Sequence, residues 1–416
     1  MTTLANAYGL IAVDKQGSNV LFLDADSYVV QQRLNGFPPR PHELVIAAAK
    51  MKAYVPLYGD GVHGDNPHPG HKIAVIDLAR RTLRGFIDIS PLQSPHTGRI
   101  GDDGRLYLCC ENSRAIVVID TDDDRVVERI ATPSANTHRL TITPSGKKLF
   151  TENEEDASIT VVDIAVLPGR VLDTIAMPGP IGGIAASPRH PYVVATAADR
   201  PALYIVDSDS HQLRGTLALN DHHHNAQVVR FNHDGSLLAV VGDGEPVVTL
   251  LDGELTPLAS LRVGNKPMDG CFSPDNALLL IANEDDGTLS AIDLPLLQVI
   301  ATPRVGEGCE VLGYFLPGGC VAASASLSQS EAVQRAEVAQ SRPRVNLAPA
   351  LLQPWVAESP SQRAKRPTNG HCAEACLAEG CYSTPSFLCR RISLFVMTSF
   401  YSGRLNHPHA FRSERL

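Results

Sequence analysis

The chain has 416 residues, of which 44% are apolar and 5% aromatic, and its formal net charge is -9. The apolar share can form a large core, and the single tryptophan, Trp355, argues against propellers whose blades each carry a Trp-Asp signature. Residues 325–416 hold 11 Lys and Arg against 6 Glu, whereas residues 1–324 hold 25 basic and 39 acidic residues. Such an acidic body repels phosphates, which argues against a nucleic-acid partner.

The sequence shows neither the pattern of a membrane-spanning segment nor that of an export signal. No window of about 18 apolar residues occurs, and the first residues lack a basic segment followed by an apolar one, so we expect a cytoplasmic protein with no membrane partner. Cys109 and Cys110 are adjacent on an expected strand, where their side chains point to opposite faces and cannot bridge each other. This use of cysteine agrees with a reducing compartment, and we expect Cys271 and Cys309 to be buried apolar residues.

An aspartate ends a β-branched apolar segment seven times. The positions are Asp24, Asp77, Asp120, Asp163, Asp207, Asp252 and Asp293. Consecutive members lie 53, 43, 43, 44, 45 and 41 residues apart, and a period of about 40 to 45 residues with four strands per unit is typical of a β-propeller blade. Because the i, i+3, i+4 spacing of helices is absent, a helical repeat is excluded. The sequence therefore predicts an all-β, seven-bladed propeller.

Turn residues recur in phase with the aspartates. They separate the first and second strands of each unit, where Gly or Asn favours a positive φ, at residues 102–104, 144–146, 188–190, 233–235 and 274–276. Residues 9–34 supply only three strands, and residues 308–319 resemble the missing innermost one. We therefore expect the ring to close with one strand from the end of the repeats and three from their beginning, which removes unpaired edges.

The units have a recognisable family pattern. The segment GCFSPDNALLLIANEDDGTLSAIDLPLLQVIAT, residues 270–302, resembles the YVTN repeats of the YncE-like, lactonase-like seven-bladed propellers. The resemblance extends over roughly residues 8–320 and implies one propeller domain over residues 8–324. It is specific for fold rather than activity, because the family includes lactone hydrolases, lyases and binding proteins. Exported relatives also leave a periplasmic location open.

The C-terminal part follows a different pattern. Residues 325–416 are rich in Ala, Ser, Arg, Gln and Pro and lack the turn and strand rhythm. We expect this segment to be disordered, or to be an out-of-frame or fused sequence. Cys372, Cys376, Cys381 and Cys389 are separated by three, four and seven residues, unlike the paired C-x2-C clusters of structural zinc sites.

One residue in each innermost strand lies eight positions before the turn. These residues are His42, His96, His138, Gly182, Gln227, Met268 and Glu310. Because the turns set the register, we expect their side chains to share one level around a central channel. Four consecutive blades contribute the three histidines and the glutamate of this set. Such side chains suit Zn, Fe(II) or Mn, and a metal ion with an open coordination position could activate water.

Two other interpretations of this arc remain open. Imidazoles act as general acids and bases near neutral pH without a metal, so the arc can bind or transform a ligand unaided. The histidines can also line a wet channel without any chemistry. A divalent metal at the channel mouth is therefore one of three alternatives.

Loops expected on the same face add further candidates. The insertion YGDGVHGDNPHPGHK, residues 58–72, lies between the second and third strands of its blade, and loops on a rigid scaffold often carry function. The candidate ligand-binding residues of this face are Asp60, His63, His68, His71, Glu111, Asn112, Glu152, Gln227 and Glu284. The Asn and Glu residues can instead cap turns, and the run His222, His223, His224 can be a solvated loop.

These observations favour one of two functions. The first is a monomeric YncE-like protein that binds a small polar molecule or metal ion in a His- and Glu-lined funnel. The alternative is a lactonase-like or lyase-like enzyme that uses His42, His96, His138 and Glu310 for acid-base or metal-assisted chemistry. We favour the first because no G-x-S-x-G elbow is present and no lactonase motif matches residue by residue.

Overall fold

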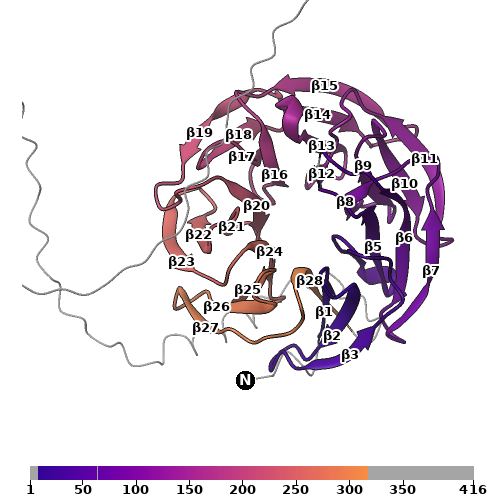
Figure 1. The fold of residues 1–416 in the computed structure, drawn as a ribbon. Coiled ribbons are helices and arrows are strands. Elements are labelled where there is room, and N and C mark those ends of the chain that lie inside the picture. Colours follow the sequence, from indigo (N-terminus) through magenta and orange to yellow (C-terminus); the bar gives the residue numbers. More distant parts are fainter. Residues whose placement is uncertain (1–7, 63, 317–416) are drawn as a thin grey trace, which may run out of the picture. The chain divides into compact units, whose positions relative to one another are not determined.

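The computed structural model describes residues 8–62 and 64–316, so the prediction for residues 325–416 and their cysteines lies outside the described residues. Seven four-stranded antiparallel sheets are arranged as blades around a common centre (Figure 1). The prediction of an all-β, seven-bladed propeller is confirmed. In the part of the chain that the structure describes, no helix is long and apolar enough to cross a membrane.

Every blade runs from an innermost to an outermost strand. The closing blade contains β28 (Cys309–Phe315), β1 (Gly9–Asp14), β2 (Asn19–Leu23) and β3 (Val30–Leu34). The next two contain β4 (Val45–Ala47), β5 (Lys52–Gly59), β6 (Pro69–Asp77) and β7 (Thr82–Asp88), then β8 (Pro95–Ile100), β9 (Leu106–Cys110), β10 (Ala115–Asp120) and β11 (Arg125–Ala131). Two short 3-10 helices, η2 (Ala48–Lys50) and η3 (Glu154–Asp156), lie in connections.

Four further blades complete the ring with the same order. They contain β12 (Arg139–Ile142), β13 (Lys148–Asn153), β14 (Ser158–Asp163) and β15 (Arg170–Ala176), then β16 (Ile181–Ala186), β17 (Tyr192–Ala197), β18 (Ala202–Asp207) and β19 (Leu213–Ala218). The last two contain β20 (Ala226–Phe231), β21 (Leu237–Gly242), β22 (Val247–Asp252) and β23 (Pro257–Arg262), then β24 (Pro267–Phe272), β25 (Leu278–Asn283), β26 (Thr288–Asp293) and β27 (Gln298–Ala301).

The closing blade joins the two ends of the repeat region. Val13 of β1 pairs with Val311 of β28 on one side and with Val20 of β2 on the other. The predicted closure by one strand plus three is therefore confirmed. In this closed sheet β1 has hydrogen-bonded neighbours on both sides, so the junction of the ring is as continuous as the other blades.

The recurrent aspartates have a common local role. Each lies at the end of the third strand of its blade and accepts a turn N–H at its side-chain Oδ1, at 2.8 to 3.0 Å. Short carboxylates favour such turns because they supply an acceptor to backbone groups that leave the sheet ladder. The predicted left-handed turn residues are observed at Gly104, Gly146, Gly235 and Asn276, where φ is 76°, 66°, 68° and 56°.

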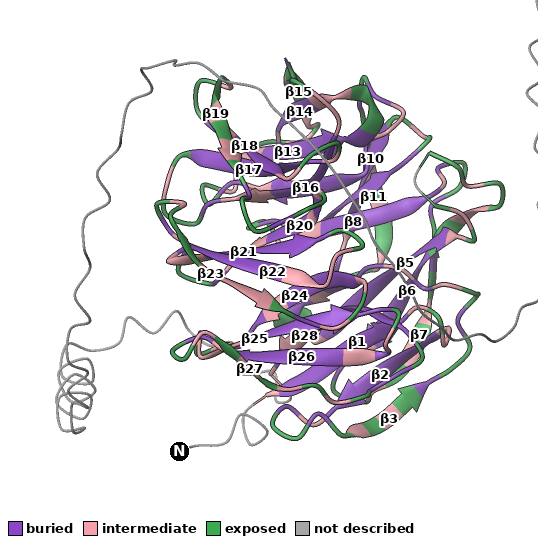
Figure 2. Cartoon of the chain, turned by 60° about the vertical axis from the view of Figure 1, so that its left-hand side comes forward, coloured by how far each residue is buried: buried purple, intermediate pink, exposed green. Residues whose placement is uncertain are grey.

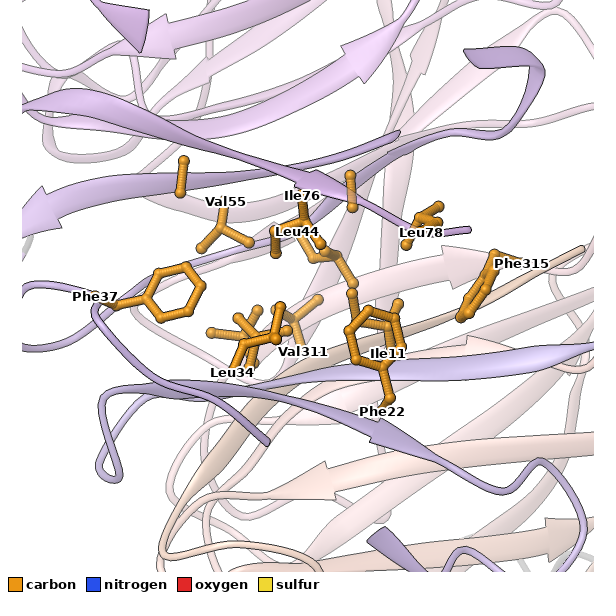
Figure 3. Close-up of a cluster of buried hydrophobic side chains, with 14 of the residues drawn as sticks. Ile11, Phe22, Leu34, Phe37, Leu44, Val55, Ile76, Leu78, Val311 and Phe315 are labelled. Carbon is orange, nitrogen blue, oxygen red and sulfur yellow. The ribbon is translucent and has the colours of Figure 1, made fainter. Parts of the chain in front are cut away.

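The cores lie between blades rather than within one sheet. Figure 2 shows buried residues along the inner and middle strands and exposed ones mainly on outer strands and loops. One cluster, drawn in Figure 3, joins the closing blade to the β4–β7 blade, and in it the rings of Phe22 and Phe315 meet edge to face at 5.8 Å. Cys109 and Cys110 are free and buried in two different clusters, as expected for neighbours on a strand.

Candidate functional site

The innermost strands bring three histidines together at the centre of the ring. His42 and His138 lie just before β4 and β12, and His96 lies in β8. Each of the first two is fixed by its backbone, because the N–H of His42 donates to Pro56 O and that of His138 to Glu152 O, both at 3.1 Å. His96 and His138 are buried, with 2% and 3% of their surface exposed.

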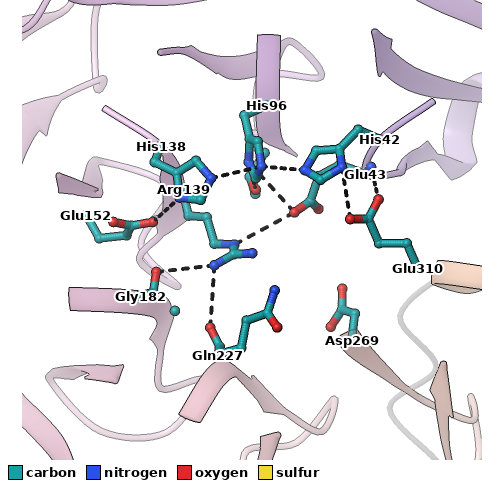
Figure 4. Close-up of polar contacts among 12 residues, drawn as sticks. His42, Glu43, His96, His138, Arg139, Glu152, Gly182, Gln227, Asp269 and Glu310 are labelled. Atoms are coloured by element: carbon teal, nitrogen blue, oxygen red, sulfur yellow. Dashed lines mark hydrogen bonds and ion pairs between the residues drawn. The ribbon is translucent and has the colours of Figure 1, made fainter. Parts of the chain in front are cut away.

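The Nε2 atoms of His42 and His138 both face Nε2 of His96. His96 Nε2 lies 2.6 Å from His42 Nε2 and 2.9 Å from His138 Nε2, so His96 is the middle member of the series in Figure 4. The ring centroids are 4.4 and 3.8 Å apart for the same two pairs. We call these three residues the histidine cluster.

The other ring nitrogens point outward to acceptors. His42 Nδ1 lies 2.9 Å from Glu310 Oε1, and His138 Nδ1 lies 2.9 Å from Glu152 Oε1 and 2.8 Å from Glu154 Oε2. His96 Nδ1 lies 3.0 Å from the Thr97 hydroxyl, which can donate or accept. Two of the three rings therefore use Nδ1–H to meet a carboxylate and direct Nε2 at His96.

Proton counting shows that three neutral rings do not satisfy this arrangement. With Nδ1–H groups of His42 and His138 directed at carboxylates, both of their Nε2 atoms carry lone pairs. His96 Nε2 can present one proton, which lies in the plane of its ring and cannot align with two acceptors at once. At least one Nε2 contact therefore needs an additional proton or a cation.

The electrostatic surroundings decide which ring can hold that proton. Burial opposes a charge on His138, but the carboxylates of Glu154 and Glu152 outweigh it and raise the pKa of His138 to about 10. Burial, with the neighbouring His138 and His42, lowers the pKa of His96 well below its usual value. Burial also lowers the pKa of His42, against the attraction of Glu310. Of the three rings, His138 is the one whose surroundings favour an extra proton.

Glu310 is fixed behind His42 rather than between the histidines. Its Oε1 accepts from Lys15 Nζ at 2.7 Å as well as from His42, and its Oε2 lies 3.3 Å from the backbone N–H of Glu43. Burial opposes ionisation, yet His42 and Lys15 hold the pKa of Glu310 well below its usual range. Glu310 is thus an ionised carboxylate that orients His42.

Two glutamates that were not predicted from the sequence, Glu43 and Glu154, also belong to the site. Ligand atoms of His42, Glu43 and His96 lie within 4.8 Å of one another, and so do those of His138, Glu152 and Glu154. Glu43 Oε1 is 3.8 Å from His96 Nδ1. Glu43 directly follows His42, and Glu154 lies two positions beyond Glu152. This closeness to residues already predicted was the available sequence signal.

Figure 4 shows a polar group beside the histidine cluster, made up of Arg139, the Gly182 carbonyl, Gln227 and Asp269. Arg139 Nη1 lies 3.5 Å from the carbonyl oxygen of Gly182 and 3.4 Å from that of Gln227. Met268 is buried, while its neighbour Asp269 points towards the group in Figure 4. Irregularities in the strand pairing explain why Asp269, and not Met268, points to the centre. They lie in the intervals Pro95/Gly98, Ile181/Ile184, Ala226/Val228 and Pro267/Asp269. Such bulges redirect side chains, so a count from the turn selects the level but not the orientation.

The inserted loop touches the site through Tyr58 and Glu111. Tyr58 OH donates to Glu111 Oε2 at 2.6 Å, the backbone N–H of Gly64 donates to Glu111 Oε1 at 2.8 Å, and the Tyr58 ring lies 5.5 and 5.4 Å from the rings of His42 and His96. Glu111 therefore fastens this loop beside the cluster.

The loop histidines form a separate group. His68 Nδ1 meets Asp60 Oδ2 at 2.9 Å, but the two side chains are 79% and 51% exposed. Both residues and His71 line a different cavity, of about 370 Å³. His63 lies outside the described residues.

The remaining predicted residues have structural contacts. Asn112 has a φ of 62°, as expected for a turn, and its N–H donates to Ala135 O, 23 positions further along the chain, at 2.6 Å. Glu284 accepts from the Gln16 amide and pairs with Lys266 at 3.1 Å. In the 222–224 run, His222 Nε2 lies 2.9 Å from the Thr249 hydroxyl, while the next two backbone N–H groups donate to a glutamate.

Comparison with known proteins shows the fold alone. No protein-family model matches the sequence, and no curated protein is significantly similar to it. Among solved structures, the Pseudomonas aeruginosa periplasmic gluconolactonase PpgL is 18% identical with a TM-score of 0.61, covering 74% of this chain and 99% of its own. A functionally unknown protein from Desulfotomaculum acetoxidans DSM 771 is 11% identical with the same score and coverages. Kuenenia stuttgartiensis hydrazine synthase is 20% identical with a TM-score of 0.58, covering 68% of this chain and 92% of its own.

Proposed function

We propose that this propeller binds a divalent transition-metal ion through the Nε2 atoms of His42, His96 and His138. The observation that carries the proposal is the convergence of three imidazoles whose outer nitrogens are already engaged. Metal-ligating histidines typically donate their second N–H to a carboxylate or other acceptor, which fixes the ring and its tautomer. Imidazole ligands suit zinc first, and also Fe(II) or Ni(II).

A bound cation would also remove the need for an additional proton between the Nε2 atoms. The lone pairs of neutral imidazoles that face one another repel, whereas one divalent ion accepts all three. Binding would displace the proton that the carboxylates hold on His138. The rings would need to move, because two nitrogens bound tetrahedrally to zinc at about 2.0 to 2.1 Å are roughly 3.3 Å apart. The two close Nε2 pairs, at 2.6 and 2.9 Å, would separate, and His42 and His138, which lie on opposite sides of His96 in Figure 4, would approach each other.

The carboxylates divide into one ligand and several orienting groups. Glu43 is the proposed oxygen ligand, because an oxygen of its carboxylate lies within 4.8 Å of ring nitrogens of His42 and His96. Its φ of 63° is uncommon outside glycine, and such conformations persist at functional sites where the surroundings enforce them. Glu310 and Glu152 are proposed to orient the imidazoles, which changes the ligand role that the sequence suggested for Glu310.

The proposed biological role is that of a monomeric, YncE-like binding protein. Its partner is a metal ion or a small polar molecule held at the centre of one face. The repeat pattern supports this family assignment, and the low identity to PpgL leaves enzymatic activity as a separate proposal.

Metal-assisted hydrolysis of a small lactone is the second candidate. A cavity of about 160 Å³ borders His138, so a bound metal could share its coordination sphere with a ligand and activate water. This candidate is tested by following the hydrolysis of D-glucono-1,5-lactone in a pH-stat, with zinc-loaded and metal-free protein. Turnover that requires zinc and is lost in His96→Ala would support it, and rates equal to the buffer alone would exclude it for this substrate.

The metal proposal is tested by zinc titration of the full-length protein. The wild type, a His42→Ala/His96→Ala/His138→Ala variant and a His68→Ala/His71→Ala control are stripped with chelator and titrated against a chromophoric competitor. The wild type and the control are expected to bind one equivalent of zinc with the same affinity, and the triple variant to lose at least a hundredfold. Equal affinity in all three proteins would refute the assignment, because the zinc would then lie elsewhere.

A further inference from the structure

Arg139 is a buried guanidinium with weak hydrogen-bonding partners. It follows His138 in β12 and is 7% exposed. Its two Nη1 contacts, at 3.5 and 3.4 Å, are at the outer limit of a hydrogen bond, and among the described residues its Nε has no hydrogen-bond partner. The nearest carboxylate oxygen for that atom, Glu43 Oε1, is 3.8 Å away. A guanidinium carries five N–H donors, and leaving the Nε–H unmet in a buried place is costly.

Three guanidinium groups, those of Arg99, Arg139 and Arg230, lie near one another in this part of the ring. Arg230 is satisfied by Asp269 through two contacts, at 2.9 and 2.7 Å. Arg99 donates to a carbonyl of its own strand at 2.8 Å, and burial together with the charge of Arg230 lowers its pKa to about 10. Arg139 feels the charges of Glu43, Glu152 and Glu154, but none of these carboxylates is a hydrogen-bond partner of its Nε. A ligand carboxylate would supply acceptors that the guanidinium of Arg139 lacks.

A cavity of about 160 Å³ lies beside Arg139, where such an anion can enter. Its walls include His138, Gly182, Gln227, Asn225 and Asp243. Water occupies about 30 Å³ per molecule in the liquid, so the volume suits roughly five waters or a solute with similarly few heavy atoms. Figure 4 shows the Gln227 amide directed toward the centre of the polar group.

We propose that this cavity binds a small hydroxy-monocarboxylate, with the carboxylate on the guanidinium of Arg139. Planar guanidinium and carboxylate groups form two parallel hydrogen bonds, which an ammonium cannot reproduce. The Gln227 amide offers a donor and an acceptor to the hydroxyl of such a ligand. Glu154 and Asp243 also line the cavity, so a dianion such as sulfate would be repelled while a single carboxylate would be tolerated.

This site does not depend on a metal and extends the proposed function to a second ligand. It is tested by calorimetric titration of chelator-treated, full-length protein with glycolate and with L-lactate, against sodium sulfate and sodium chloride at equal ionic strength. Saturable binding of at least one hydroxy acid is expected for the wild type, with Arg139→Gln weakening it at least tenfold. The matched control is Arg170→Gln, because Arg170 is 74% exposed and pairs with Asp163 on an outer strand. Its affinity is expected to equal that of the wild type.

Several results would overturn the proposal. These are the absence of saturable binding to the wild type, equal binding in Arg139→Gln, and sulfate binding as tight as that of the hydroxy acids. Should Arg139→Gln fail to fold, Gln227→Ala decides, with a threefold to tenfold loss expected and no loss contradicting the site. Binding that appears only after zinc is added would refute the metal-independent site while leaving the metal proposal standing. Hydroxy-acid binding by a protein that binds no zinc would support the Arg139 site and refute the metal proposal.

Discussion

Replacing Glu310 by glutamine tests whether the carboxylates behind the histidine cluster hold it in place. The carboxylate is buried and accepts from Lys15 at 2.7 Å, from His42 at 2.9 Å and from a backbone N–H at 3.3 Å. Removing one partner of a buried ion pair costs about 3 to 5 kcal/mol, because the remaining charge stays buried without compensation. At about 2 °C per kcal/mol for a large domain, the melting temperature is expected to fall by roughly 6 to 10 °C.

The pH dependence of this effect has a defined sign. The pKa of Glu310 is lowered in the folded protein, so its stabilisation is present above the unfolded value of about 4.3 and is lost as the pH falls toward the folded value. The difference in unfolding free energy between wild type and Glu310→Gln should therefore be constant from about pH 7 to pH 5 and then shrink.

The assay is equilibrium urea unfolding of metal-free protein at a series of pH values. The matched control is Glu307→Gln, because Glu307 is 70% exposed and lies 3.7 Å from Arg304, so the same charge is removed with little expected change in stability. A Glu310→Gln variant as stable as the wild type at pH 7 would refute the reasoning. A difference that stayed constant down to pH 3 would show that the loss has another cause.

Three further predictions follow from the same structure. Zinc binding at pH 7 should release about one proton, because His138 has a pKa of about 10, and the apparent affinity should rise about tenfold per pH unit up to pH 9. Calorimetry in buffers of different ionisation enthalpy checks this, and a pH-independent affinity would contradict it. Phe315→Ala should lower the unfolding free energy by about 3 to 5 kcal/mol, whereas Phe86→Ala, 43% exposed, should change it little in urea melts. Equal effects would contradict ring closure by β28. Tyr58→Phe should cost about 1 to 3 kcal/mol in the same assay, because buried Glu111 loses a donor, and an unchanged midpoint would contradict that contact.

The architecture was predictable because its determinants are local and repeated. Each strand-ending aspartate, such as Asp77 or Asp120, caps its own turn within three residues, so its spacing reports the blade period directly. The missing first strand was also predictable, because residues 9–34 supply three strands and the closed sheet needs a fourth. Only a segment with the same pattern could pair with β1, and β28 does so.

The sequence predicted which histidines lie at the centre of the ring, but not the hydrogen bonds and ion pairs that connect them to other residues. The count from the turn selected His42, His96 and His138, whose rings meet at the centre. It could not select Glu43 or Arg139, because each is one position further along and faces the centre only through the local backbone geometry. The φ of 63° at Glu43 depends on tertiary packing that the sequence does not display.

The loop candidates show the same limit. Composition drew attention to His68 and His71 because histidine-rich loops often bind ligands, yet they line a different cavity from the one beside His138. Glu111 was selected as a candidate ligand-binding residue, and in the structure its carboxylate accepts a hydrogen bond from Tyr58. A loop's residue types can be read from sequence, whereas the direction of its side chains depends on contacts with other blades.

X-ray absorption spectroscopy of the zinc-loaded, full-length protein tests the central claim most directly. The account predicts a zinc site with three imidazole nitrogens at about 2.0 to 2.1 Å and oxygen ligation, and a loss of imidazole scattering in His96→Ala. A spectrum dominated by sulfur, or one that His96→Ala leaves unchanged, would show that the converging Nε2 atoms are not the metal site.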